Sequence, residues 1–121
     1  MLLDLATIKE HIKDYLSQKS ELQQIEKTTG VEFTGKIPAM QGKQKVDGFY
    51  FASIIEKPKD VRFYFFPIYT HANEFQLSEE LQKQLKGKSC FHIKKCSKET
   101  LNEISRLIDK GISLYKKDQL I

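Results

Sequence analysis

The sequence predicts a two-layer α+β sandwich, in which an antiparallel sheet of about four or more strands carries the N- and C-terminal helices on one face. Segments of strand-like composition are grouped in the middle of the chain, whereas both ends show the three- and four-residue periodicity of amphipathic helices. This order argues against the repeating βαβ units of nucleotide-binding folds. A chain of 121 residues, 40% of them hydrophobic, is expected to form one domain, residues 1–121.

The first helix is expected to be long. Its apolar positions begin at Leu5, and the pattern continues less regularly through Leu22 and Ile25 to Gly30. On one continuous helix, three carboxylates would fall within about 40° of one another on the side opposite the core. These residues are Glu10, Asp14 and Glu21.

This carboxylate stripe is a candidate metal site, because hard cations bind clustered carboxylate oxygens. Three lysines flank the stripe, however, and a solvated helix face commonly carries such charges. Both interpretations stay open. The flanking residues are Lys9, Lys13 and Lys19.

The middle of the chain is expected to form three strands. The first is the short segment 31–35, and a loop rich in turn-forming residues follows at 36–48. The second and third strands are Phe49–Ile55 and Val61–Tyr69, joined by a hairpin-like turn. Alternation in the third strand puts aromatic side chains on both faces, which indicates either a strand covered on both sides or one face in a partly open cleft.

The last third is expected to contain a short helix at 78–85, the strand Cys90–Lys94 and a terminal helix from about Lys98 to Tyr115. Ser97 is the expected N-cap of the terminal helix. Gly111 interrupts the apolar stripe of that helix, and a glycine there costs about 1 kcal/mol relative to alanine. It therefore indicates a close approach to the sheet or fraying toward the end.

The strand Cys90–Lys94 contains the most distinctive candidate site. Phe91 and Ile93 should face the core, so the other face carries polar and reactive side chains. If this strand lies in the same sheet as Val61–Tyr69, that face could recognise a small ligand, a metal ion or a partner protein. The candidate ligand-binding residues are Tyr50, Tyr64, Phe66, Cys90, His92 and Lys94.

Cys90 and His92 are also candidate zinc ligands, which Cys96 or His71 could complete if the chain turns after Lys94. The spacing of four ligands typical of a zinc site is not found, and free cysteine is among the residue types most often buried. The alternative is a core cysteine beside a hydrogen-bonded histidine. We expect no cofactor, and the only alternative that the sequence leaves open is iron or zinc.

A second candidate site is basic. Residues 81–98 contain six lysines and no acidic residue, although the net charge of the chain is only +4. Such a patch attracts anions and could steer phosphate-bearing partners, but a solvated rim has the same composition and no nucleic-acid-binding module is recognisable. The candidate anion-binding residues are Lys83, Lys86, Lys88 and Lys95.

No catalytic signature is found in the sequence. On one strand the Cβ atoms of Cys90 and His92 would lie about 6 to 7 Å apart, longer than direct proton transfer requires. A phosphate-cradling glycine loop and a paired-histidine metalloprotease helix are also missing. We therefore expect a protein that is not an enzyme.

Location and redox state can be inferred from the same sequence. No apolar run reaches the ~18 to 20 residues of a membrane span, and the N-terminus does not resemble a secretory signal. We expect a cytoplasmic protein without a membrane partner. The two cysteines are too far apart on one strand for a disulfide, since six residues of strand span ~20 Å, so we expect reduced thiols.

Four segments resemble a known family, the YdhG-like domain of unknown function that is widespread in bacteria. They are GKIPAMQGK at Gly35–Lys43, YFFPIY at Tyr64–Tyr69, LKGKSCFHIKK at Leu85–Lys95 and LIDKGISLYKK at Leu107–Lys117. The resemblance implies a small α+β domain. It also implies an iron-chaperone-like role, because some relatives are described as frataxin-like intracellular iron chaperones.

The sequence thus favours a small non-enzymatic binding domain with its site on the aromatic, Cys and His face of the sheet. The first alternative is a binder of anions or nucleic acid through the basic segment Lys83–Lys98, although we do not expect nucleic acid itself. The second alternative is a module that forms a homodimer through its aromatic face.

Overall fold

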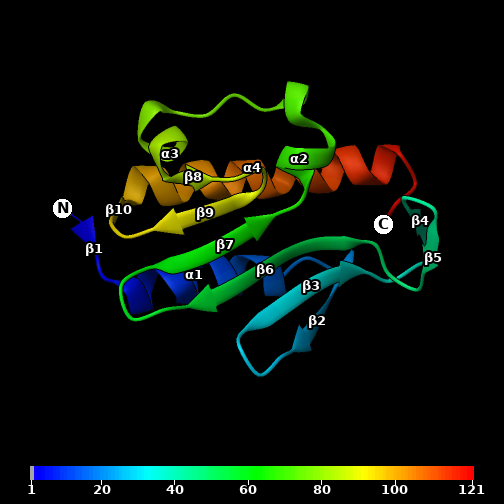
Figure 1. Cartoon of the computed structure of the whole chain (residues 1–121), viewed down its shortest axis with the longest axis horizontal. Coiled ribbons are helices and arrows are strands. Elements are labelled where there is room, and N and C mark those ends of the chain that lie inside the picture. The colour runs from blue at the N-terminus through cyan, green and yellow to red at the C-terminus, as the bar shows by residue number, and fades with distance from the viewer. Residues whose placement is uncertain (1) are drawn as a thin grey trace.

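The largest element is a six-stranded antiparallel sheet with two helices, one from each end of the chain, behind one of its faces (Figure 1). The computed structural model describes residues 2–121. The helices are α1 (Leu5–Ser17), α2 (Pro67–Thr70), α3 (Glu79–Gln84) and α4 (Lys98–Lys117), with a 3-10 turn, η1 (Ala72–Glu74). The strands are β1 (Leu2–Leu3), β2 (Leu22–Glu26), β3 (Val31–Gly35), β4 (Ala39–Gln41), β5 (Gln44–Val46), β6 (Tyr50–Glu56), β7 (Val61–Phe65), β8 (Leu85–Lys86), β9 (Cys90–Ile93) and β10 (Cys96–Ser97).

The fold class is as expected from the sequence, an α+β structure whose terminal helices α1 and α4 pack on the same face. The strand order in the main sheet is β2-β3-β6-β7-β9-β8, and all neighbouring pairs are antiparallel. Two further pairs, β1-β10 and β4-β5, lie outside this sheet. Most sequential connections in the sheet join antiparallel neighbours, but the connection from β7 to β8 runs through α2, η1 and α3 and leaves room for β9 between the two strands.

The core lies between the sheet and its two long helices. Phe63 of β7 and Phe91 of β9 are register partners with their ring centroids 6.1 Å apart, and both are fully buried. Phe65 and Ile93 share this buried face, as the alternation in the sequence predicts. The helices contribute a matching apolar stripe: Ile8, Ile12 and Leu16 from α1, and Leu101, Ile104, Leu107, Ile108, Ile112 and Tyr115 from α4.

The first helix is much shorter than its periodicity suggests. It ends at Ser17, and Leu22–Glu26 is the edge strand β2, paired with β3 over five residue pairs. The five residues between Leu16 and Leu22 are all polar, so a continued helix would turn polar side chains toward the core one turn after Leu16. Pairing with β3 satisfies the backbone instead, and it outweighs the weak helical propensity of this segment.

The third predicted strand also ends early. β7 stops at Phe65, and Pro67 begins the short helix α2. Proline has no N–H to donate to a strand ladder, but it suits the first turn of a helix. Phe66 is therefore the residue before α2 and not a member of the strand face that carries Tyr64.

The predicted loop at 36–48 contains a small hairpin. Strands β4 and β5 are joined by a two-residue turn at Gly42 and Lys43. Gly42 has a φ of +65°, a conformation that this tight turn requires and that glycine adopts without strain. The side chain of Gln41 accepts a hydrogen bond from the backbone N–H of Tyr50, which ties the hairpin to the start of β6.

Helix α4 agrees closely with its prediction. The Oγ of Ser97 accepts a hydrogen bond from the backbone N–H of Thr100 at 3.2 Å, so Ser97 is the N-cap. A Cβ built on Gly111 would lie 2.9 Å from atoms of both Phe65 and Pro67. Gly111 therefore marks the close approach of α4 to the end of β7, the first of the two explanations that the sequence suggests.

The N-terminal residues extend past the sheet as a short strap. Leu3 of β1 is the register partner of Cys96 in β10, and Cys96 is fully buried. Within residues 2–121, no helix combines the length and apolar character that crossing a bilayer would require.

Candidate functional site: a basic groove between α3 and β9

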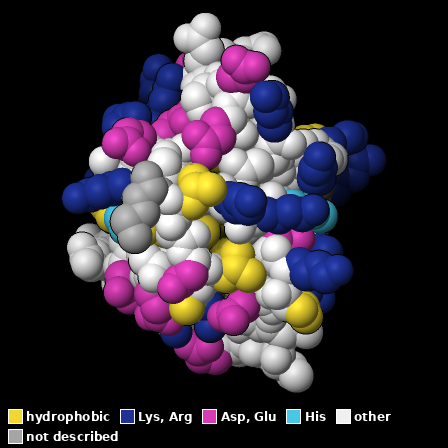
Figure 2. Space-filling view, turned by 90° about the vertical axis from the view of Figure 1, so that its left-hand side faces the viewer, with side chains coloured by type: hydrophobic (Ala, Val, Ile, Leu, Met, Phe, Trp, Pro, Cys, Tyr) yellow, Lys and Arg dark blue, Asp and Glu magenta, His cyan; other side chains and the backbone are white. Residues whose placement is uncertain are grey.

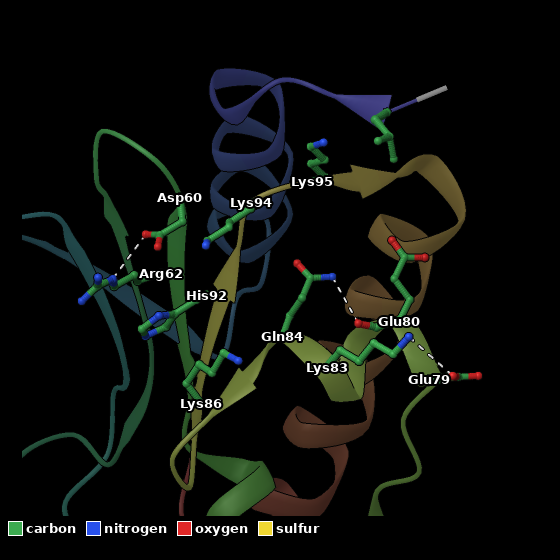
Figure 3. Close-up of a pocket in the computed structure, with 11 residues that line it drawn as sticks. Asp60, Arg62, Glu79, Glu80, Lys83, Gln84, Lys86, His92, Lys94 and Lys95 are labelled. Atoms are coloured by element: carbon green, nitrogen blue, oxygen red, sulfur yellow. Dashed lines mark hydrogen bonds and ion pairs between the residues drawn. The ribbon is translucent and has the colours of Figure 1, made fainter.

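A groove of about 1060 Å³ lies between helix α3 and the outer side of strands β7 and β9 (Figure 3). It begins where strand pairing ends, because β8 pairs only with Cys90 and Phe91 of β9. Beyond Phe91 the neighbour of β9 is the helix α3. The lining residues are Leu2, Asp60, Arg62, Glu79, Glu80, Lys83, Gln84, Lys86, His92, Lys94 and Lys95.

The register of the sheet brings three basic side chains together around His92. Arg62 of β7 is the direct cross-strand partner of His92, so their side chains share the outer face at the usual pair spacing of about 5 Å. Lys86 is the partner of Cys90, which places it diagonally beside His92 on that face. Lys94, two residues along the chain, extends the cluster at the other end (Figure 3).

The charges in the groove do not balance. Five basic side chains line it against three carboxylates, an excess of two positive charges. Two of the carboxylates are engaged, since Asp60 pairs with Arg62 at 3.3 Å and Glu79 pairs with Lys83 at 3.5 Å. Across the described residues 2–121, Lys86, Lys94 and Lys95 have no carboxylate within ion-pair distance.

Basic and acidic side chains occupy separate areas at the end of the molecule that Figure 2 shows. In Figure 2, Lys and Arg side chains run across the middle of this end of the molecule, while Asp and Glu gather above and below them. Arg62 in the groove pairs with Asp60, whose side chain is only 8% exposed. A buried carboxylate fixes the guanidinium plane, and a fixed guanidinium is suited to recognising a second planar anion.

The wall opposite the strands is formed by α3 and contains an amide with an unused acceptor. The Nε2 of Gln84 donates to the backbone carbonyl of Glu80 at 3.3 Å, which fixes the amide orientation. Its Oε1 is buried and, within residues 2–121, has no hydrogen-bond partner. In Figure 3 this oxygen points from the end of α3 toward the β9 side of the groove.

The groove unites two sets of residues that the sequence analysis treats separately. His92 and Lys94 come from the expected ligand face, and Lys83, Lys86 and Lys95 come from the expected anion patch. Lys88 does not line the groove; its Nζ lies 5.4 Å from the ring centroid of Tyr69. The remaining ligand-face residues, Tyr50, Tyr64, Phe66 and Cys90, lie outside it.

Those remaining residues form two smaller groups. Tyr50, Phe66 and Tyr69 are in ring contact near the start of β6, with centroids 5.4 and 5.8 Å apart. Burial raises the pKa of Tyr50 to about 12, although the hydrogen bond with Ser53 acts in the opposite direction. Tyr64 and Cys90 are cross-strand partners on the outer face of the sheet.

Both cysteines are free and buried, as expected of reduced thiols. Burial raises the pKa of the Cys90 thiol, although hydrogen bonding to Tyr64 partly offsets the effect. Burial raises the pKa of Cys96 to about 12, assisted by the charges of Glu80 and Glu103. At neutral pH both groups are therefore neutral thiols, whereas nucleophiles and metal ligands are thiolates.

The carboxylate stripe does not exist on one helix, because α1 ends before Glu21. That residue lies in the turn before β2, and its Oε2 accepts a hydrogen bond from Lys116 at 3.2 Å. Glu10 and Asp14 are exposed on α1. The part of the chain from residue 2 to residue 121 contains no group of three or more His, Cys, Asp and Glu side chains arranged to hold a metal ion.

Six lining residues of the groove were not predicted as site residues from the sequence: Leu2, Asp60, Arg62, Glu79, Glu80 and Gln84. Arg62 could have been found, because alternation places it on the same face as Tyr64. Asp60 and Gln84 carry no sequence signal, since one follows a turn and the other ends a short helix. Their roles depend on how α3 docks beside β9, and that docking is a tertiary contact.

Comparison with known proteins gives no assignment: no family model, no curated protein and no solved structure matches the chain. The resemblance to the YdhG-like family therefore stays a prediction from the four segments that carry it. The case for function depends on the groove.

Proposed function

We propose that this protein is a non-enzymatic binding domain whose groove between α3 and β9 binds an anionic ligand. One observation carries the proposal: Lys86, Lys94 and Lys95, which have no carboxylate partner among residues 2–121, line one hollow together with Arg62 and His92. The proposal joins the ligand-face and anion-patch hypotheses, because the two predicted sites overlap in space.

The physical reason is that like charges held on one rigid wall repel one another until an anion lies between them. A concave surface of one sign also concentrates oppositely charged ligands and speeds their association. Arg62 is already oriented by Asp60, so part of the entropy cost of ordering its side chain is met before the ligand arrives. A bound anion should therefore stabilise the folded protein in proportion to its occupancy.

The chemistry of the lining favours binding over covalent catalysis. The groove offers cations, carboxylates, an amide and one imidazole, whereas the Cys90 thiol lies outside the lining and has a raised pKa. An activated nucleophile needs a lowered pKa or a base within hydrogen-bond reach. We therefore propose recognition as the role of the groove.

Isothermal titration with citrate and with inorganic phosphate tests the proposal at low ionic strength. Wild type should bind at least one of these anions, and Lys86→Gln and Lys94→Gln should each weaken binding severalfold. Lys88→Gln is the matched control, because it removes the same charge from the same lysine-rich segment but outside the groove. Absence of binding by both anions, or an equal loss in the Lys88 variant, would refute the proposal.

Salt dependence separates this groove from a polyanion surface. A nucleic acid would contact many lysines of the segment Lys83–Lys98, so its affinity would fall with a steep power of the salt concentration. A small anion held by two or three cations should show a shallow slope. A steep slope with single-stranded DNA, together with equal effects of Lys86→Gln and Lys88→Gln, would favour the nucleic-acid alternative.

A further inference from the structure

We infer that the ligand of the groove is a small acidic zwitterion, whose ammonium group pairs with Glu80 and whose two or more acid groups pair with the lysines of the facing wall. This inference depends on the proposed anion-binding function and adds the class of ligand. It follows from the charges that remain in the groove beside its internal ion pairs, and from the opposite walls on which those charges lie.

Internal ion pairs account for only part of the charge in the groove. Asp60 pairs with Arg62 at 3.3 Å, and Glu79 pairs with Lys83 at 3.5 Å. The other charged lining residues are three lysines and one carboxylate: Lys86, Lys94, Lys95 and Glu80. Across residues 2–121, none of these four side chains forms an ion pair. A ligand that mirrors them carries several negative charges and one positive charge.

These unpaired charges lie on opposite walls of the groove. Glu80 belongs to the first turn of α3, whereas Lys86 belongs to β8. Lys94 and Lys95 directly follow the end of β9. In Figure 3 the Glu80 side chain stands on the α3 side and Lys94 on the β9 side. Because both signs line one hollow without meeting, a ligand that carries both signs can contact both walls at once.

Glu80 opposes the binding of a ligand that carries negative charge only. Its carboxylate repels an acid group in the same groove, whereas it attracts an ammonium group there. Inorganic phosphate or a plain dicarboxylate gains attraction from the lysines but none from Glu80. An ammonium group on the same ligand replaces that repulsion with an ion pair. Glu80 therefore discriminates between zwitterions and simple anions, through repulsion of one class as well as attraction of the other.

The position of Glu80 assigns the ammonium group to one end of the groove. Burial raises the pKa of the Cys96 thiol to about 12, and the charge of Glu80 adds to this shift, so the Glu80 carboxylate lies near β10. Leu2, on the strand that pairs with β10, lines the groove as well. Lys86 is the register partner of Cys90, at the far end of β9. The acid groups of the ligand therefore extend from the β10 end toward Lys86.

The size of the groove suits a small molecule of this class. Its volume of about 1060 Å³ is at the upper limit of ordinary small-ligand pockets, which hold about 300 to 1,000 Å³. An amino dicarboxylate fits within it, with bridging water at its margins. Arg62, already oriented by Asp60, offers a planar guanidinium to one of the carboxylates.

The experiment compares free glutamate with glutarate, which has the same carbon chain and both carboxylates but no ammonium group. Affinities are measured by isothermal titration at neutral pH and low ionic strength for wild type, Glu80→Gln, Lys86→Gln and Glu99→Gln. Glu99 is the matched control for Glu80, because it is also an exposed carboxylate in the first turn of a helix but lies outside the groove lining. Urea unfolding checks that Glu80→Gln is as stable as wild type, as expected for an exposed side chain.

Wild type should bind glutamate about threefold to fivefold more tightly than glutarate, which is the contribution of one exposed ion pair. Glu80→Gln should abolish this preference in two ways. It should weaken glutamate, because the partner of the ammonium group is lost, and it should tighten glutarate, because a repulsive carboxylate is removed. Lys86→Gln should weaken both ligands, and Glu99→Gln should change neither.

Failure of this inference can be told apart from failure of the proposed function. If glutarate binds as tightly as glutamate in wild type, the zwitterion inference is overturned while the anion-binding function stands. A preference for glutamate that survives Glu80→Gln, or that Glu99→Gln abolishes, would place the ammonium group elsewhere and overturn the inference too. If citrate or phosphate binds but glutamate and glutarate do not, the inference alone fails. If none of the four ligands binds, the proposed function fails and the inference fails with it.

Discussion

Replacing one of two adjacent aromatic residues in β7 with alanine tests which face of the sheet is the core. Phe65 is fully buried, and its ring centroid lies 5.6 Å from that of Phe51 and 5.6 Å from that of Phe75. Tyr64, the preceding residue, is partly exposed on the outer face. The two substitutions remove aromatic rings of similar size from opposite environments.

The expected losses can be estimated from these environments. A buried phenylalanine truncated to alanine costs about 3 to 5 kcal/mol, through lost transfer free energy and a residual cavity. Phe65→Ala should lower the free energy of unfolding by about 4 kcal/mol. The residues around Phe65 come from β6, from the position after η1 and from α4, so they cannot all move into the cavity that the substitution leaves. Tyr64→Ala should cost about 1 kcal/mol, because water already reaches part of the ring and no cavity is closed in.

Both free-energy losses are measured by unfolding the variants in urea. The transition is monitored by far-ultraviolet circular dichroism, because the chain contains no tryptophan for a fluorescence signal. Unchanged slopes with denaturant would show that the midpoint shifts report stability. Equal large losses at Phe65 and Tyr64 would refute the reasoning, because the outer face would then be core. A loss below about 1 kcal/mol at Phe65 would refute it as well.

Three further predictions concern other parts of the fold. Gly111→Ala should destabilise the protein by about 1 to 2 kcal/mol in urea, because overpacking against Phe65 outweighs the gain of about 1 kcal/mol in helix propensity; a stabilised variant would contradict the close approach. Partial burial alone would raise the pKa of Asp109, but hydrogen bonds from lysine and tyrosine outweigh it and the pKa is lowered. The Asp109 carboxylate therefore stabilises the folded protein above the unfolded pKa of about 3.9, and this stabilisation is lost as the pH falls through the folded pKa. Asp109→Asn should lower the free energy of unfolding by less than about 1 kcal/mol at pH 7 and should have no effect at strongly acidic pH. Cys90 and Cys96 should react slowly with a thiol reagent at pH 7 in the native protein and fully after denaturation, and rapid native labelling of both would show that their raised pKa values are wrong.

Sequence periodicity predicted the inside and outside of the sheet better than it predicted where elements end. The alternation around Phe63 and Phe91 assigned their faces, because a half-buried strand repeats every two residues. The end of β7 was missed although Pro67 marks it, and the apolar spacing at Leu22 and Ile25 was taken for helix. Spacing over so few residues fits either period, and pairing with β3 decided between them.

The site was predicted only in part for a related reason. His92 and the lysines of the segment 83–95 are visible in the sequence, since their types and spacing are unusual. The groove that joins them exists because α3 docks beside β9, which depends on long-range packing. The buried acceptor of Gln84 depends on that packing, whereas Asp60 and Arg62 are only two residues apart and their pairing is a local contact.

The most direct test of the central claim is a nitrogen-15 NMR titration of the full chain with citrate, in wild type and in Lys86→Gln. If the groove binds anions, the backbone amides of residues 83–95 and Arg62 should shift most in wild type, and the shifts should shrink severalfold in the variant. Shifts confined to other surfaces, or shifts in residues 83–95 that survive the substitution unchanged, would contradict anion binding in this groove.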